Sequence, residues 1–144
     1  MKRHVALVRL SREHHTALVL AKHAMNLDLA SDEAVAAFTR RLGVLVEAEI
    51  EPHFCREEVA LLPLLAAKQT AETPLVQRTL DEHRNLRELV ASIQAGDRVA
   101  IPAFGRALEA HVHFEERTLF PVAESVLSPA ELAELPGRYA PASS

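Results

Sequence analysis

Hydrophobic residues recur every three or four positions along four stretches of the chain, which is the period of an amphipathic helix. The pattern predicts helices over about residues 5–29, 32–62, 74–95 and 99–121. Long helices joined by short connections favour antiparallel neighbours in an up-and-down bundle. The predicted fold is therefore all-α, an antiparallel four-helix bundle whose apolar stripes face one core.

Local signals define where these helices begin and end. Ser31 precedes two acidic residues and is a predicted N-cap, while Thr73 is a cap followed by proline at the first helical position. Gly96 is predicted to stop the third helix. Pro52 predicts a kink in the second helix, and Pro63 is predicted to end its regular part.

A short fifth helix is predicted after the bundle. Ser128 and Glu131 have the spacing of a capping box, and Pro136 followed by Gly137 is predicted to terminate this helix. We expect a connector over residues 64–73, with a turn of helix at its start, and a loose C-terminal tail. Residues 1–144 are predicted to form a single domain, with a core of about 5–125 and a short helix and tail over 128–144.

Each predicted helix carries a histidine in the middle of its inward stripe, where apolar residues are expected. The predicted inward faces are Leu7, Leu10, His14, Leu18, Ala21 and Met25; Val35, Phe38, Leu42, Leu45, Glu49, His53 and Glu57; Val76, Leu80, His83, Leu86 and Val90; and Phe104, Leu108, His111, Glu115 and Leu119. The bundle would thus place imidazoles and carboxylates at one level of its core.

One motif occurs twice. Residues 53–63 and 111–121 share a histidine, three residues, two glutamates, two residues, two large apolar residues and a proline. Residues four apart lie on one helix face, so each copy presents an imidazole beside a carboxylate. The other two helices share a Glu-His pair, at Glu13-His14 and Glu82-His83. The chain resembles one helix pair used twice.

The composition narrows the possible functions. The formal net charge is −4 and the basic residues are scattered, which argues against nucleic-acid binding. No apolar run is long enough for a membrane span or a signal peptide, so we expect a soluble, cytoplasmic protein. Cys55 is the single cysteine, which excludes disulfides within the chain and cysteine-based zinc sites.

Imidazole and carboxylate side chains on apolar stripes point to metal binding. An unpaired buried carboxylate costs roughly several kcal/mol, and a metal pair removes that cost by using these groups as ligands. This ligand set, without thiolate, suits iron, manganese or zinc. The predicted metal ligands are His14, His53, Glu57, His83, His111 and Glu115. The alternative is a purely structural polar core.

Several nearby residues have competing interpretations. His14 is preferred over His15 as a ligand because it follows Leu10 by one turn and matches the Glu-His pattern of the third helix. Glu58 and Glu116 are interpreted first as exposed partners of Arg or Lys, with support of the ligands or direct ligation as alternatives. Arg87 lies one turn after His83, where it either pairs with an acidic residue and stabilises an anionic ligand or extends to solvent. Cys55 is predicted to be an inert thiol. Three further histidines are predicted to lie at the surface, namely His4, His23 and His113.

With these motifs the chain resembles the hemerythrin-like (HHE cation-binding) domain family over about residues 5–125. The resemblance implies a bundle around a non-haem diiron centre, two iron ions with an oxo or hydroxo bridge. It also implies that the four histidines are terminal ligands and that Glu57 and Glu115 bridge the irons. Oxygen-carrying members have a further histidine where this chain has Arg87, and an aspartate five residues after the fourth-helix histidine, where this chain has Glu116.

The resemblance implies binding of dioxygen or a related small oxidant, in sensing, scavenging or redox handling. The expected partners are a diatomic or peroxide ligand and an electron donor or signalling protein. The alternatives are a peroxidase, nitric-oxide-handling or iron-sulfur repair-type enzyme, and a metal storage or sensing protein. Whether the protein is an enzyme stays open at this stage.

Overall fold

The computed structural model describes residues 3–68 and 73–139. The first and third bundle helices are α1 (Val5–Met25) and α5 (Thr73–Gln94). The other two are long rods that contain π-helical turns, labelled η. The second bundle helix is built from α2 (Asp32–Leu45), η1 (Val46–Ile50), α3 (Glu51–Arg56), η2 (Glu57–Leu61) and α4 (Leu62–Ala67). The fourth is built from α6 (Ala100–Phe114), η3 (Glu115–Leu119) and α7 (Phe120–Val126), and α8 (Pro129–Tyr139) follows it.

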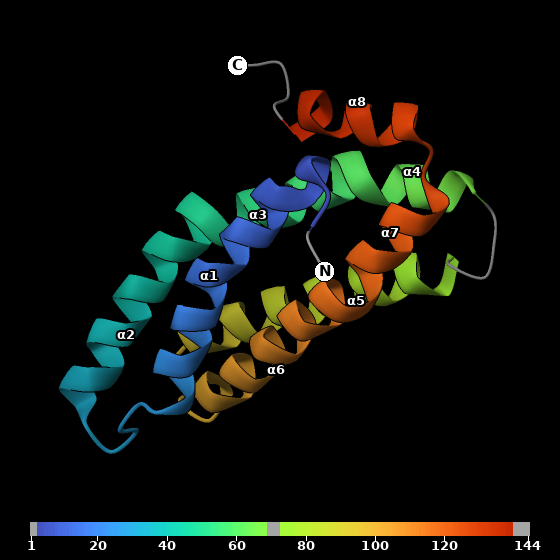
Figure 1. Cartoon of the computed structure of the whole chain (residues 1–144). Helices are drawn as coiled ribbons and strands as arrows, with labels where there is room; N and C mark the ends of the chain where they lie inside the picture. Colours follow the sequence, from blue (N-terminus) through green and yellow to red (C-terminus); the bar gives the residue numbers. More distant parts are fainter. Residues whose placement is uncertain (1–2, 69–72, 140–144) are drawn as a thin grey trace.

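The predicted all-α fold is confirmed, and the described residues contain no strand. Successive long helices run in opposite directions, and α8 lies alongside the second bundle helix, where it packs against η2 and α1 (Figure 1). The buried hydroxyl of Tyr139 donates a hydrogen bond to the carbonyl oxygen of Ala6 at 2.7 Å. This bond attaches the last described residue of α8 to the first turn of α1.

Three prolines lie within the rods and do not end them. Pro52, Pro63 and Pro121 each follow a π-helical turn by two residues. A proline lacks the N–H that would continue the hydrogen-bond ladder, and the wider π turn accommodates the missing bond. The prediction that Pro63 ends the regular part of the second helix is therefore wrong, and the turn of helix expected at the start of the connector is the end of this helix, which continues to Ala67.

The π turn η1 also changes which side chains face the core. Glu49 was predicted to face inward, but it is exposed and Ile50 is buried instead. The extra residue in the turn rotates the following side chains by about one position relative to a regular helix. His53 and Glu57 still face inward, because the period of the sequence pattern resumes after the turn.

The remaining helix ends follow their local signals with one exception. The backbone N–H of Ala34 donates to the Ser31 hydroxyl at 3.1 Å, and Gly96 has a φ of 103°, as expected for a helix-ending glycine. Ser128 and Glu131 form the capping box. Pro136 does not terminate α8, which continues to Tyr139. Residues 69–72 of the predicted connector and 140–144 of the predicted tail lie outside the described residues.

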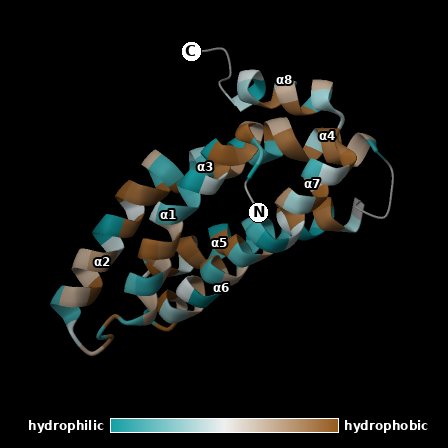
Figure 2. Cartoon of the chain, in the orientation of Figure 1, coloured by the Kyte–Doolittle hydropathy of each residue, from teal (hydrophilic) through white to brown (hydrophobic). Residues whose placement is uncertain are grey.

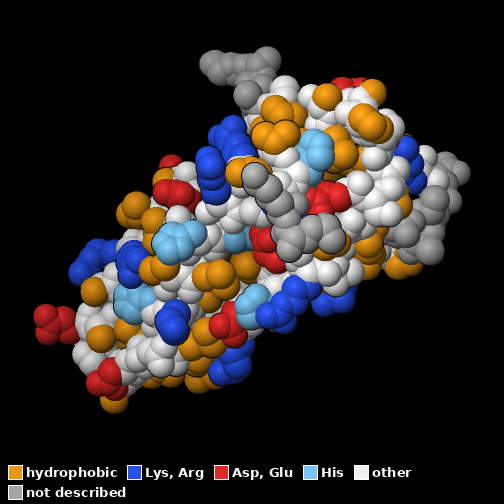
Figure 3. Space-filling view, in the orientation of Figure 1, with side chains coloured by type: hydrophobic (Ala, Val, Ile, Leu, Met, Phe, Trp, Pro, Cys, Tyr) orange, Lys and Arg blue, Asp and Glu red, His pale blue; other side chains and the backbone are white. Residues whose placement is uncertain are grey.

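The apolar core has two parts. One part, which includes Leu7, Leu61 and Phe120, lies toward α8, and the other, which includes Phe38 and Phe104, lies toward the opposite end of the bundle. Hydrophobic and hydrophilic residues alternate along the ribbons, as expected for helices with one buried face (Figure 2). On the face shown in Figure 3, basic and acidic side chains are interspersed. Within the described segments, no helix is both long and apolar enough to cross a membrane.

Helices α1 and α6 approach each other closely at Gly105. A Cβ atom at this position would lie 2.7 Å from the carbonyl oxygen of Ala21 and 2.7 Å from the Cγ atom of Met25. Glycine therefore allows the two backbones to come together here, and the contact sets the spacing of the helices that carry His14 and His111.

Candidate metal centre

A layer of polar side chains separates the two parts of the apolar core. It contains the six residues that the sequence analysis selected as ligands, and all six are buried. They come from each of the four long helices and are His14, His53, Glu57, His83, His111 and Glu115. The fold thus brings together groups separated by up to about a hundred positions in the chain.

The two glutamates lie at the centre of the layer. The carboxylate oxygens of Glu115 lie 2.7 Å from the Nε2 atom of His14 and 3.1 Å from that of His111. The carboxylate oxygens of Glu57 lie 3.0 Å from the Nε2 atom of His83 and 3.2 Å from that of His53. Each carboxylate therefore faces one histidine from each half of the chain.

These side chains form two overlapping groups. One contains His14 and His53 with both glutamates, and the other contains His83 and His111 with the same glutamates. Within each group, one donor atom from every residue lies within 4.8 Å of the others. Donor atoms bound to one ion at about 2.0–2.2 Å lie roughly 3–4 Å apart, so the observed spacing fits one ion per group. The arrangement suits a binuclear metal site.

Four atoms of this layer are buried and have no hydrogen-bond partner among the described side chains. They are the Nε2 atoms of His53 and His111 and one carboxylate oxygen each of Glu57 and Glu115. Buried polar atoms in folded proteins nearly always have a partner, and leaving one unpaired costs about 1–3 kcal/mol. Bound cations would satisfy all four atoms, so the donor set fits a metal pair.

The outer nitrogen of each histidine contacts a carboxylate. The Nδ1 atom of His53 lies 2.7 Å from a carboxylate oxygen of Glu13, and the Nδ1 atom of His111 lies 2.6 Å from a carboxylate oxygen of Glu82. The corresponding pairs are His14 with Glu116 at 2.6 Å and His83 with Glu58 at 2.7 Å. An ionised carboxylate only accepts hydrogen bonds, so Nδ1 carries a proton, and Nε2 is the nitrogen that faces the centre.

Arginines neutralise these outer carboxylates. Glu58 pairs with Arg87 at 2.9 Å, and Glu82 pairs with Arg78 at 2.8 Å. The other two pairs are Glu13 with Arg56 and Glu116 with Arg3. Among the described side chains, Glu57 and Glu115 form no ion pair with Lys or Arg. The negative charge left at the centre is thus that of two buried carboxylates, which favours cations.

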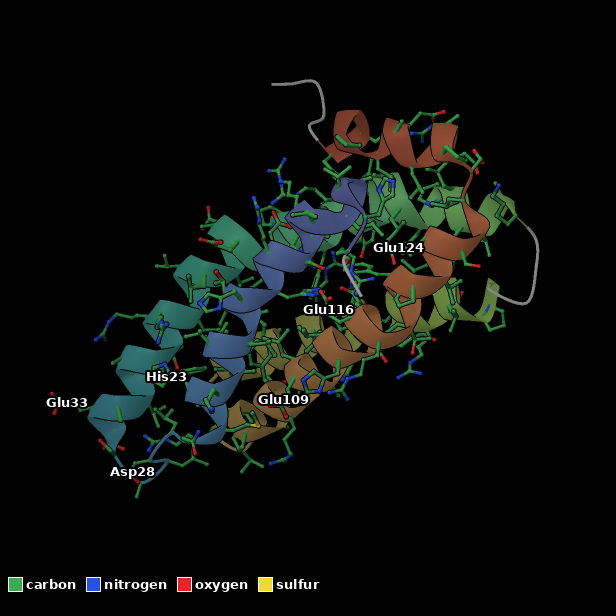
Figure 4. The ribbon with its side chains drawn as sticks, viewed as in Figure 1. His23, Asp28, Glu33, Glu109, Glu116 and Glu124 are labelled. Carbon is green, nitrogen blue, oxygen red and sulfur yellow. The ribbon has the colours of Figure 1, made fainter. Side chains whose placement is uncertain are left out.

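The first residues of the chain also support the centre. The Arg3 side chain donates to Glu116 and to Glu124, and the backbone N–H of His4 donates to Glu124 at 2.6 Å. Figure 4 labels Glu116 and Glu124, which lie on the same side of the bundle near the N-terminal end of α1. Because Glu116 orients His14, this network connects the start of the chain to the ligand set.

The protein groups alone already show how strongly this layer attracts positive charge. Burial would lower the pKa of His83, but the nearby carboxylates of Glu115 and Glu57 outweigh that effect and raise the pKa to about 9. Burial acts the same way on His111, and the charge of Glu115 raises its pKa to about 10. Protons and metal ions therefore compete for the same nitrogen atoms.

The π turns place the central carboxylates. Glu57 is the first residue of η2 and Glu115 is the first residue of η3. Such turns are rare and occur frequently at functional sites. In each motif copy the histidine lies in the α-helical turn just before, so both side chains of the His-xxx-Glu pair reach the same layer.

The structure resolves several of the alternatives. His14 lies in the cluster, whereas the neighbouring His15 is exposed. Cys55 is exposed, but slight desolvation of its thiol and the nearby carboxylates of Glu51 and Glu58 raise the pKa of the thiol, which disfavours the reactive thiolate. His113 is half-buried outside the cluster. The remaining two histidines are only half-buried: His4 caps α1, and the ring of His23 contacts Arg41.

Glu58, Glu116 and Arg87 have closer roles than first interpreted. Both glutamates pair with arginine as expected, but they are half-buried and each also contacts a histidine of the centre. Arg87 joins Glu58 to Glu51 on the outside of the cluster. The interpretation of the two glutamates as exposed partners of basic residues is incomplete, because the bundle brings the second glutamate of each pair against a neighbouring helix.

The role of Glu13 and Glu82 was not anticipated from the sequence. Each contacts the histidine of an adjacent helix instead of the histidine that follows it in the chain. The available signal was the repetition itself, since a glutamate precedes the histidine in both the first and third helices. Repetition indicated a shared role, and only the packing of the helices identified the partner.

Comparison with known proteins agrees with this geometry. Residues 5–123 match a protein-family model described as the hemerythrin HHE cation binding domain. Comparisons with curated proteins and with solved structures gave no match. The matched range contains every residue of the buried histidine and glutamate layer.

Proposed function

Because the chain belongs to the hemerythrin HHE cation-binding domain family, we propose that its buried layer holds two iron ions and binds dioxygen or a related small oxidant. The observation that carries the proposal is the pair of overlapping donor groups, each with two histidines of its own and the same two glutamates. Imidazole and carboxylate donors without thiolate suit iron. In this proposal Glu57 and Glu115 would be shared by the two ions, and the four histidines would supply the remaining protein donors.

The protein side chains around the layer would orient the metal-binding groups and keep water away from them. The Glu13, Glu58, Glu82 and Glu116 carboxylates orient the imidazoles, and their arginine partners keep this outer layer neutral. Apolar core on both sides of the layer excludes water from the centre. Two adjacent iron ions, when bound, supply a pair of electrons to a small oxidant and can be reduced again by a donor.

Four histidines and two glutamates are the only side chains in the two donor groups, so two bound ions would keep room for a small ligand. This supports a role in sensing, scavenging or redox handling of an oxidant. We also propose a cytoplasmic partner, either an electron donor or a signalling protein, which would bind at the protein surface.

The test is the metal content of protein purified without chelator, together with its near-ultraviolet spectrum before and after anaerobic reduction and readmission of air. We expect two irons per chain and a charge-transfer band that disappears on reduction and returns with air. Zinc in place of iron, or no spectral change with air, peroxide or nitric oxide, would refute the proposed chemistry. Repeated turnover of peroxide or nitric oxide would instead identify an enzyme.

A pair of adjacent substitutions provides a matched control for the ligand assignment. His14→Ala removes a buried ring that faces Glu115, whereas His15→Ala removes an exposed ring one position away. We expect the first variant to lose iron and the second to retain it. Equal iron content in the two variants would contradict the ligand assignment.

A further inference from the structure

A pocket of about 200 Å³ lies beside the metal centre, between the second bundle helix and α5. Its walls include Ile50 and Phe54 from the second bundle helix, Leu86 from α5 and Phe104 from α6. Ile50 is the last residue of the π turn η1, which is the turn that brings this side chain into the interior. An irregular turn thus contributes directly to the wall of the pocket.

The polar residues that line the pocket are partly exposed, and its apolar residues include buried ones. Glu51 and Arg87, which both line the pocket, form an ion pair in which 40% of the Glu51 side chain and 37% of the Arg87 side chain are exposed. The inner walls are buried, since Ile50 is 5% exposed and Phe104 is 0% exposed. Moving an ion into such an apolar space is unfavourable, so the interior suits a small uncharged molecule.

Phe54 is the wall that the pocket shares with the metal centre. Its ring stacks on the ring of His83, with centroids 4.0 Å apart, and meets the ring of His111 edge-on at 5.8 Å. Phe54 also lines the pocket, and the Arg87 guanidinium lies 5.4 Å from the centroid of its ring. A molecule inside the pocket is therefore separated from two of the histidines by one aromatic side chain.

The two halves of the centre differ at this point. In the second copy of the motif, the position that corresponds to Phe54 is occupied by Val112. The ring that stacks on His14 is that of Phe120, at a centroid distance of 5.5 Å. The pocket with its aromatic wall thus lies on the side of His83 and His111, and the duplicated sequence does not require the two ion positions to behave alike.

From these contacts we infer that the pocket admits a small uncharged apolar molecule of the size class of dioxygen and holds it beside the His83 and His111 side of the centre. The identification of this molecule as dioxygen rests on the proposed function. The volume exceeds the roughly 150 Å³ of an engineered apolar cavity that binds xenon or benzene, so a diatomic molecule fits with room to move.

Xenon tests the pocket without depending on oxygen chemistry. Crystals of the protein as purified, pressurised with xenon, are expected to show a xenon atom in contact with Ile50 and Phe104. Val46→Trp places a large ring into the pocket from its wall and should abolish that site. The control is Val44→Trp, which adds the same side chain two positions away, where the wild-type residue is 66% exposed. Absence of xenon from the pocket of the wild-type protein would overturn the inference.

The rate of reoxidation tests whether the pocket leads to the centre. After anaerobic reduction and rapid mixing with oxygen, Val46→Trp is expected to slow reoxidation by about tenfold, equal to roughly 1.4 kcal/mol in the barrier, with unchanged iron content. Val44→Trp should match the wild type. If the wild-type protein binds xenon in the pocket but Val46→Trp is reoxidised as fast as the wild type, oxygen does not reach the centre through this pocket. An iron-loaded protein that does not react with oxygen would refute the proposed function, and xenon occupancy would still decide whether the pocket binds an apolar molecule.

Discussion

The Nδ1 atom of His111 lies 2.6 Å from a carboxylate oxygen of Glu82, on the neighbouring helix α5. Glu82 also pairs with Arg78 one turn earlier, so its position is held from both sides. Its counterpart Glu13 has the same relationship to His53. Each half of the centre therefore has a supporting carboxylate that lies outside the buried layer of six side chains.

Neutralising Glu82 should weaken metal binding. Glu82→Gln keeps the shape of the side chain but removes the charge that orients the imidazole and raises its basicity, so we expect the metal affinity to fall by roughly 10- to 100-fold. The measurement is competition against a chelator of known affinity. The control is Glu88→Gln, on the exposed face of the same helix. Indistinguishable affinities for the two variants would show that the outer carboxylates do not support the ligands.

Removing the metal should destabilise the protein. A ligand that binds only the folded state stabilises it by about 4 kcal/mol when its free concentration is a thousand times the dissociation constant. Stripping the ions with a chelator is therefore expected to lower the midpoint of thermal unfolding measured by calorimetry, and adding metal back should restore it. An unchanged midpoint would favour the purely structural polar core.

Gly105→Ala should destabilise the contact between α1 and α6. The added methyl group would meet the Ala21 carbonyl oxygen and the Met25 side chain at 2.7 Å, and such overpacking costs about 1–3 kcal/mol. Gly43→Ala is the matched control, because its nearest neighbour is a side-chain atom of Gln94 at 3.9 Å. There we expect a gain of up to about 1 kcal/mol from helix propensity. The free energy of unfolding of both variants is measured with denaturant. If Gly105→Ala is as stable as the wild type, the close approach of α1 and α6 is contradicted.

The pH dependence of stability should contain a contribution from His23. Partial burial and the nearby Arg41 guanidinium lower the pKa of this histidine below its usual value of 6.5. The unfolded chain then binds the proton more readily than the folded chain. The contribution of His23 is present above pH 6.5 and is lost as the pH falls toward its folded-state pKa.

His23→Gln isolates this contribution from the other histidines. The free energy of unfolding of the wild type should decrease more between about pH 8 and about pH 5 than that of the variant. The two proteins are compared by denaturant unfolding at both pH values. A steeper decrease in the variant would show that the pKa shift has the opposite sign.

Much of the fold could be read from local patterns because they act over a few residues. Ser31, Gly96 and the Ser128–Glu131 capping box defined helix ends through hydrogen bonds and backbone conformations that neighbouring residues determine. The prolines were harder. Their effect depends on whether a π turn precedes them, and helix period alone does not distinguish a terminating proline from an accommodated one.

The sequence by itself determined the all-α fold and selected the six residues that meet in the buried layer, because apolar periodicity and a motif used twice place them on inward faces. Only the tertiary structure decided which carboxylate supports which histidine, that Glu49 faces solvent, and that a pocket adjoins Phe54. The physical reason is that helix period is a local property. Partners across the bundle, and the space left between helices, depend on how the helices pack.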